Sequence, residues 1–302
     1  MRVAIAGGTG FVGKTLTEQL LKDGHEVLIL TRRIKEAANH EQLFFLQWLP
    51  EGEDTIKQLE NLDAFINLAG ESLNSGRWTE KRKHIILNSR LETTSAVISI
   101  IKQLKNKPRV LVNASAIGIY GTSLTETFTE ETNLTGSDFL AETVRLWETQ
   151  ALTAEELEIR TVLCRFGLIL DKQLGALPKI ALPYKLFIGG NVGSGDQWVS
   201  WISIEDVVQG ILFTIENEGL NGPINMTAPS PVRMKEFGQT LGTILHRPHW
   251  IPVPGAALRI ILGEMSILVL EGQKVLPNVL LQAGYRFKYS DLYSALKNIY
   301  QK

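Results

Sequence analysis

A serine and a tyrosine five residues apart in this 302-residue chain could handle a substrate oxygen. Ser115 follows the apolar run of residues 110–114, and Tyr120 lies on the segment beyond it. A serine hydroxyl can hydrogen-bond a substrate oxygen, and a phenol near a cation can exchange a proton with it. Lys83 is one candidate for that cation. The alternative makes Tyr120 a packing aromatic and Lys83, in a run of charged residues, a solvated surface group.

The chain also carries a glycine turn close to its N-terminus, after the apolar run of residues 3–6 and before a helical pattern over residues 11–22. In such a turn the three glycines permit a tight bend, close approach of a pyrophosphate, and close packing of helix on strand. The N–H groups that begin the helix favour phosphate too. An ordinary turn between strand and helix is the alternative. The predicted dinucleotide-binding residues here are Gly7, Thr9, Gly10, Phe11, Val12 and Gly13.

The end of the second predicted strand distinguishes between two dinucleotides. An NAD site usually has an acidic residue about 20 residues after the turn, where it binds the ribose 2′-hydroxyl. This strand ends in Thr31, Arg32 and Arg33, with no acidic residue. Guanidinium forks can hold a 2′-phosphate through charge-assisted hydrogen bonds. The sequence therefore favours NADP(H) over NAD, with solvated loop charges as the alternative for the two arginines.

These residues must be positioned by a sheet, because short apolar runs alternate with helical patterns through the first half of the chain. Strands are predicted over residues 3–6, 26–30, 43–47, 63–68, 110–114 and 160–165. Helices are predicted over residues 11–22, 80–105 and 137–156. This alternation predicts an α/β fold with a Rossmann-like, doubly wound parallel sheet.

The alternation of predicted strands and helices ends after residue 170. Glycines and prolines crowd a loop-rich stretch, followed by a helix over 204–215, a strand over 223–226, a helix over 234–245 and a largely helical tail from 254. We predict an NADP-binding domain over 1–170 and a smaller, mostly helical substrate-side domain over 171–302, with 200–226 as a stretch that can return to the sheet. The glycine-rich segment 189–198 is either a mobile lid, with Trp198 or Trp201 stacking on a ring, or a plain connecting loop with a core tryptophan.

The composition limits the classes of partner that this chain is expected to bind. The net charge is −1, from 31 basic and 32 acidic residues, so the chain has no excess charge to attract nucleic acid or an anionic membrane. The single cysteine, Cys164, sits in an apolar run and is predicted to be a core residue, and the five scattered histidines predict no metal site. The first residues lead directly into a strand, and charges interrupt the apolar stretch 256–270. A cytoplasmic protein with a small-molecule partner is expected.

Taken together, these motifs resemble the extended short-chain dehydrogenase/reductase superfamily, of the NAD-dependent epimerase/dehydratase type. The glycine turn matches closely, and the run Asn67-Leu68-Ala69-Gly70 looks like an element that lines the cofactor site. The resemblance places a helix asparagine at Asn88 and a catalytic serine at Ser115. The landmark Arg165-Phe166-Gly167 also matches, so Arg165 joins the expected cofactor-site residues.

A narrower resemblance covers nearly the whole chain. The runs Gly70-Glu71-Ser72, Asn88-Ser89-Arg90 and residues 258–265 and 272–277 look like the YfcH-like "epimerase family protein" group. That group carries a C-terminal domain of unknown function. The resemblance adds Glu71 to the expected cofactor-binding residues, and it implies no particular substrate.

One departure from the superfamily matters for catalysis. Its Tyr-x-x-x-Lys pair exchanges a proton with substrate, but the corresponding positions here are Phe139 and Thr143. Glu142 is a candidate acid or base beside the vacated position, or else a solvated helix residue. A Tyr-x-x-x-Lys spacing does occur from Tyr293 to Lys297, where chance on an amphipathic helix explains it.

Two functions remain open. The first is an NADP(H)-dependent oxidoreductase or epimerase acting on a small hydroxyl- or carbonyl-bearing substrate, which includes nucleotide sugars, with Ser115, Tyr120, Asn88 and Glu142 as the candidate catalytic residues. The second is a catalytically silent protein that senses NADP(H) and regulates a partner. The long helices 80–105 and 137–156 are also a candidate homodimer face, on the analogy of the fold alone.

Overall fold

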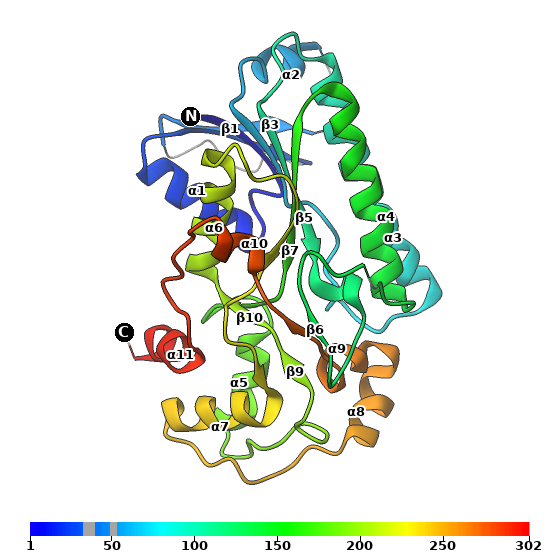
Figure 1. Ribbon diagram of the computed structural model, residues 1–302, viewed down its shortest axis with the longest axis vertical. Coiled ribbons are helices and arrows are strands. Elements are labelled where there is room, and N and C mark those ends of the chain that lie inside the picture. The colour runs from blue at the N-terminus through cyan, green and yellow to red at the C-terminus, as the bar shows by residue number, and fades with distance from the viewer. Residues whose placement is uncertain (33–39, 49–52, 134, 302) are drawn as a thin grey trace.

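Seven parallel strands form the centre of the computed structural model, which describes residues 1–32, 40–48, 53–133 and 135–301 (Figure 1). Their order in the sheet is β11-β7-β5-β4-β1-β2-β3. The bounds are β1 Arg2–Ala6, β2 Glu26–Thr31, β3 Leu43–Gln47, β4 Ala64–Asn67, β5 Val110–Ala116, β7 Arg160–Phe166 and β11 Gly222–Met226. The chain runs outward from β1 in both directions, so a crevice opens at the carboxyl ends of β1 and β4, where such folds bind ligands.

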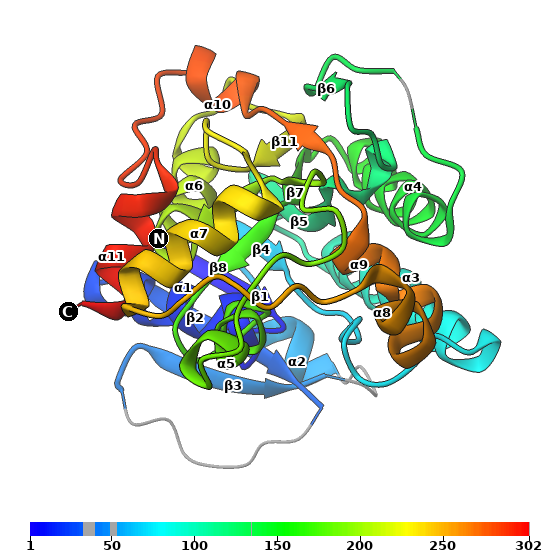
Figure 2. The same cartoon turned by 90° about the horizontal axis from the view of Figure 1, so that it is seen from below.

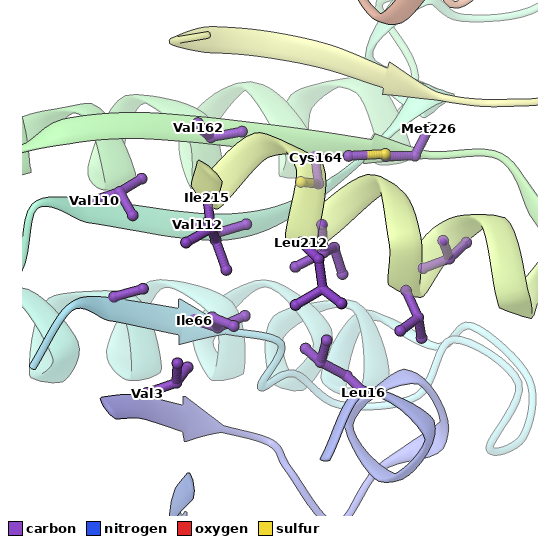
Figure 3. Packing of buried hydrophobic residues seen from close by; sticks show 14 of the residues in the cluster. Val3, Leu16, Ile66, Val110, Val112, Val162, Cys164, Leu212, Ile215 and Met226 are labelled. Carbon is purple, nitrogen blue, oxygen red and sulfur yellow. The ribbon is translucent and has the colours of Figure 1, made fainter. Parts of the chain in front are cut away.

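Helices cover both faces of this sheet. On one face lie α1 (Phe11–Lys22) and α6 (Ile204–Glu216), and on the other lie α3 (Glu80–Gln103) and α4 (Phe139–Leu152) (Figure 1). Alternate side chains of β1 face opposite ways: Val3 packs with the α1 and α6 side chains, as Figure 3 shows, whereas Ala4 packs with those of α3. The predicted doubly wound, Rossmann-like α/β fold is therefore confirmed.

The two long helices on the second face are shorter than predicted. The helix predicted over 137–156 begins at Phe139, because the Asp138 carboxylate accepts hydrogen bonds from the Leu140 and Ala141 N–H groups at 2.8 and 3.1 Å. It changes to a 3-10 turn, Thr153–Leu157, after Leu152. Caps of this kind set helix ends that apolar periodicity does not show.

The remaining elements form a smaller part with its own core. Buried side chains of three helices meet there, namely α5 (Leu177–Lys185), α7 (Met234–Leu245) and α11 (Leu292–Tyr300). Trp201 lies in this core, fully buried, with its indole N–H donating to the Ser230 carbonyl at 3.0 Å. The sequence after residue 170 is not all in this part, since α6 covers the large sheet and β11 pairs with β7.

Short strands and helices complete the fold. The strand pairs are β8 (Leu168–Leu170) with β10 (Trp201–Ser203), β9 (Trp198–Val199) with β12 (Val232–Arg233), and β6 (Thr127–Phe128) with β13 (Lys274–Val275). The short helices are α2 (Glu53–Gln58), α8 (Gly255–Leu262), α9 (Ile267–Leu270) and α10 (Asn278–Gln282). Across the ranges described above, the helices are all too short or too polar to span a bilayer.

Candidate functional site

The glycine turn connects β1 to α1 through backbone contacts that leave no room for side chains. Gly7 has a φ of +81°, and a Cβ there would come within 2.8 Å of the Leu68 carbonyl oxygen. A Cβ on Gly13 would lie 2.3 Å from the Gly7 carbonyl oxygen. Both positions therefore need glycine for the turn to exist at all.

The start of α1 is open on the side away from these contacts. Gly10 precedes the helix and gives it no side-chain cap, and Thr9 and Gly10 are exposed. The first N–H groups of any helix lack partners within the helix, so those of Phe11, Val12 and Gly13 can face an anion. A bare backbone bend beside an uncapped helix fits the pyrophosphate of a dinucleotide.

A loop after β4 forms the neighbouring rim, and α3 holds it in place. The Asn67 side chain accepts from the Ala69 N–H at 3.2 Å, and the Ser89 hydroxyl accepts from the Glu71 N–H at 3.0 Å. Arg90 donates to the Glu71 carbonyl at 3.1 Å, and burial lowers its pKa to about 10. Leu68, Ala69, Gly70 and Glu71 therefore lie beside the glycine turn as a fixed rim.

The predicted helix residue Asn88 does not take part in holding this rim. Its side chain is exposed on α3, whereas its neighbours Ser89 and Arg90 make the contacts just described. At the end of β2, the Thr31 carbonyl accepts from the Trp48 N–H at 2.7 Å, and Arg32 follows with an exposed side chain. Arg33 lies outside the described residues.

Five buried polar side chains form a network at the carboxyl ends of β5, β7 and β11. The Ser115 hydroxyl donates to the Glu148 carboxylate at 2.5 Å. The Arg165 guanidinium donates two hydrogen bonds of 2.8 Å to the same carboxylate. A third Arg165 bond of 2.8 Å reaches the Tyr120 oxygen, and the phenol donates to the Asn225 side chain at 2.9 Å. The network brings Ser115, Tyr120 and Arg165 together, as members of one buried cluster.

The hydroxyl protons of Ser115 and Tyr120 both already have an acceptor inside the protein. Burial raises the pKa of the Tyr120 phenol, and its ring stacks on Phe128 with centroids 5.3 Å apart. Burial alone would lower the pKa of Arg165, but its bonds to Glu148 outweigh that effect and raise it. Tyr120 is therefore packed and hydrogen-bonded in the interior, and three Arg165 N–H groups donate to Glu148 and Tyr120.

Two members of this network, Glu148 and Asn225, were not predicted from the sequence. The sequence does carry a weak sign of Glu148, because a carboxylate there interrupts the apolar stripe of α4 that is formed by Ala141, Val144 and Trp147. No local pattern in the sequence points to Asn225, because it lies 105 residues from its partner Tyr120 in the chain.

An aromatic cluster surrounds Phe139, which stands where the superfamily has its tyrosine. Phe139 meets Trp78 edge-on at 5.4 Å, and the Lys83 ammonium lies 5.6 Å from the Phe139 ring centre. Thr143 is buried and donates to the Phe139 carbonyl at 2.7 Å. Glu142 points outward instead, where its ion pair with Arg145 at 2.5 Å lowers its pKa.

A segment of the C-terminal part reaches this cluster. Glu264 pairs with Lys83, which also contacts Glu80 at 3.2 Å. Arg77 donates to the carbonyls of Ile260 and, at 3.1 Å, of Ile261. Hydrogen bonding to Glu264 raises the pKa of Lys83 and keeps the ammonium charged. Figure 2 shows α8 and α9 beside α3, so this segment borders the aromatic cluster around Phe139.

The glycine-rich segment 189–198 is bonded to its surroundings at several points. The Gly193 N–H donates to the Val253 carbonyl at 3.0 Å, and the buried Gln197 amide donates to the Val269 carbonyl at 2.9 Å. Trp198 donates to the Leu124 carbonyl at 3.0 Å, and the Arg233 guanidinium stacks on its ring at 3.8 Å. These contacts are those of a fixed connecting loop.

The fold, the glycine turn and the rim after β4 define a nucleotide-binding protein of the Rossmann type. The chain belongs to the NAD dependent epimerase/dehydratase family, which it matches over residues 3–165. Residues 253–299 match a domain of unknown function, DUF1731, that includes the segment carrying Glu264. The resemblance identified from the motifs is thereby confirmed.

Similar proteins include two bacterial ones and one human one. The chain is 48% identical to the epimerase family protein YfhF of Bacillus subtilis, with 99% of this chain and 98% of that protein covered. It is 44% identical to the epimerase family protein SAR0825 of Staphylococcus aureus, over 99% and 98% of the two chains. The crystal structure of human epimerase family protein SDR39U1 with NADPH superposes with a TM-score of 0.88 at 33% identity, and each chain is fully covered.

Removing the carboxylate of Glu148 tests the buried network. Glu148→Ala leaves Arg165 buried without its counter-charge, so the free energy of unfolding should fall by about 3–5 kcal/mol. Glu142→Ala, on the exposed face of the same helix, should leave the denaturation midpoint unchanged. Urea denaturation of both variants measures the difference, and equal midpoints would contradict the network's structural role.

Proposed function

We propose that the protein is an NADP(H)-dependent oxidoreductase or epimerase acting on a small substrate that bears a hydroxyl or carbonyl group. The observation that carries this proposal is the cradle at the start of α1, where Gly7 and Gly13 admit only backbone. The cradle lies beside the rim Ala69-Gly70-Glu71, at the end of the sheet where folds of this type hold dinucleotides.

NADP(H) rather than NAD is part of the proposal. Arg32 is exposed at the carboxyl end of β2, where a guanidinium can bind a 2′-phosphate. The human relative, which is 33% identical, was crystallised with NADPH. More distant structures of the same fold, at 16% identity, hold NAD and UDP-glucose, so nucleotide sugars are one substrate class to test.

The protein's contribution to the reaction differs from the usual tyrosine relay. A bound nicotinamide dinucleotide supplies hydride transfer. Because the Ser115 proton is directed at Glu148, the serine oxygen offers a lone pair and can accept a hydrogen bond from a substrate hydroxyl. Lys83, held protonated by Glu264 and Glu80, can stabilise negative charge on a substrate oxygen. Phe139 and Trp78 form an apolar wall that limits water.

A second candidate is a catalytically silent protein that senses NADP(H). The network around Glu148 favours it, because the Ser115 and Tyr120 protons both go to internal acceptors. Asn88 and Glu142, the other two candidates for catalysis, point to solvent. A sensor would bind the cofactor and leave it unconsumed.

Cofactor preference is tested by titrating NADPH and NADH separately. Wild-type protein should bind NADPH more tightly, and Arg32→Ala should weaken NADPH about tenfold or more while leaving NADH unchanged, because only NADPH carries the 2′-phosphate. Lys22→Ala, at the far end of α1, serves as the control with unchanged affinities. Tighter binding of NADH than of NADPH by the wild type would contradict the preference.

Turnover distinguishes the two candidate functions. NADPH oxidation with aldehydes and ketones, and epimer formation from nucleotide sugars, should reveal one substrate class that reacts. Lys83→Met should then lower kcat about tenfold or more with the NADPH dissociation constant unchanged, because the ammonium acts on the substrate oxygen. Lys81→Met, exposed on the same helix, is the matched control. Tight NADPH binding with no turnover on any substrate would support the sensor instead.

A further inference from the structure

One end of the C-terminal part exposes large apolar side chains from two segments. The first segment is the end of α5 with the residues after it, and the second lies between α7 and α8, along the lower end of the molecule in Figure 1. Six side chains, here called the apolar tip, are each 44–66% exposed: Leu182, Leu186, Phe187, Ile188, Trp250 and Ile251. A contiguous exposed patch of this kind marks an interaction surface more often than chance.

The two segments are joined into one rigid surface. The N–H groups of Trp250 and Ile251 both donate to the Gly189 carbonyl, at 2.9 and 3.1 Å. The Trp250 indole N–H donates to the Phe187 carbonyl at 2.8 Å, so its polar atom is turned inward. The apolar rings and chains are thus presented outward by a fixed backbone.

The backbone of the tip is also prepared for an apolar environment. The N–H groups of Leu186, Phe187 and Ile188 all donate to carbonyls of α5, at 3.1, 2.9 and 2.9 Å. N–H groups satisfied inside the chain do not oppose transfer out of water. Phe187 takes a left-handed conformation with a φ of +63°, which is unfavourable for a bulky residue, and its ring is half exposed with the Arg247 guanidinium 4.3 Å from its centre.

The two segments that form the tip carry charges of one sign. Residues 176–190 and 245–254 contain Lys179, Lys185 and Arg247 but no aspartate or glutamate, although the whole chain has 32 acidic residues. Beside the tip, a shallow cavity of about 460 Å³ is lined by Arg247, His246 and His249 together with polar groups of α7. Two copies joined face to face through this surface would bring like charges together, which argues against a second copy.

We propose that the apolar tip docks on the surface of a membrane that contains anionic lipids. Trp250 and Phe187 would enter the interface between headgroups and acyl chains, a depth that aromatic side chains favour. The three cations would face lipid phosphates, and their attraction is local, so the chain's net charge of −1 does not oppose it. The tip's position at one end of the long axis lets it reach a flat bilayer without burying the crevice of the large sheet (Figure 1).

Vesicle cosedimentation tests this proposal with the full chain. The wild type should bind vesicles of equimolar phosphatidylcholine and phosphatidylglycerol, bind phosphatidylcholine vesicles weakly, and lose binding as salt rises. Phe187→Ser with Trp250→Ser should lower the partition ratio about tenfold or more, and Lys179→Glu with Lys185→Glu should do the same on the mixed vesicles. Phe44→Ser and Lys102→Glu with Lys107→Glu, exposed at other sites, are the matched controls.

Three outcomes would overturn the proposal. No binding of the wild type to mixed vesicles at low salt is the first. The second is a dimer in light scattering that the Phe187→Ser, Trp250→Ser variant disperses, because a second copy would then cover the tip. The third is retention on immobilised polyglutamate through the same residues with no vesicle binding, which would assign the tip to an acidic protein. Unchanged melting temperatures of the variants would show that lost binding is not unfolding.

Discussion

The closeness of two backbone segments at the glycine turn governs the candidate site. Gly13 can lie against the Gly7 carbonyl, and Gly7 against the Leu68 carbonyl, only because neither residue has a Cβ. That packing sets the direction of α1 and brings its uncapped first turn beside the rim after β4. The position of the crevice and the burial of β1 follow from the same constraint.

The side of the crevice formed by β5 and α4 differs from the superfamily pattern, because its polar side chains are buried and bonded to one another. Phe139 and Thr143 stand where the superfamily has its tyrosine and lysine. Phe139 packs on Trp78, and Thr143 donates to the Phe139 carbonyl within α4, while Ser115 and Tyr120 are bound into a network around Glu148. This buried network links β5, β7 and β11 to α4, and it directs the Ser115 and Tyr120 protons to acceptors inside the protein. Lys83, a cation beside the vacated position, is held by Glu264 from the DUF1731 region.

Much of the fold could be predicted from the sequence, because parallel strands buried on both faces read as apolar runs and the glycine turn fixes the first of them. The site was harder to predict. The motif Asn88-Ser89-Arg90 lies on the stretch of α3 that contacts the rim, but helix geometry turns Asn88 to solvent, and Ser89 and Arg90 make the contacts. In the sequence, Glu264 is only a charge that interrupts an apolar stretch. Its partner Lys83 lies 181 positions away, and local sequence patterns do not show contacts at that separation.

The most direct test of the account compares NADPH binding by wild-type protein and by Gly10→Ala in isothermal titration. A Cβ on Gly10 would lie 3.1 Å from the Gly7 carbonyl oxygen, a tight fit that the fold can absorb, but it would stand on the exposed side of the turn where phosphate approaches. The account predicts that affinity falls about tenfold or more while the melting temperature changes little. Equal affinity in the two proteins, or no NADPH binding by the wild type, would contradict it.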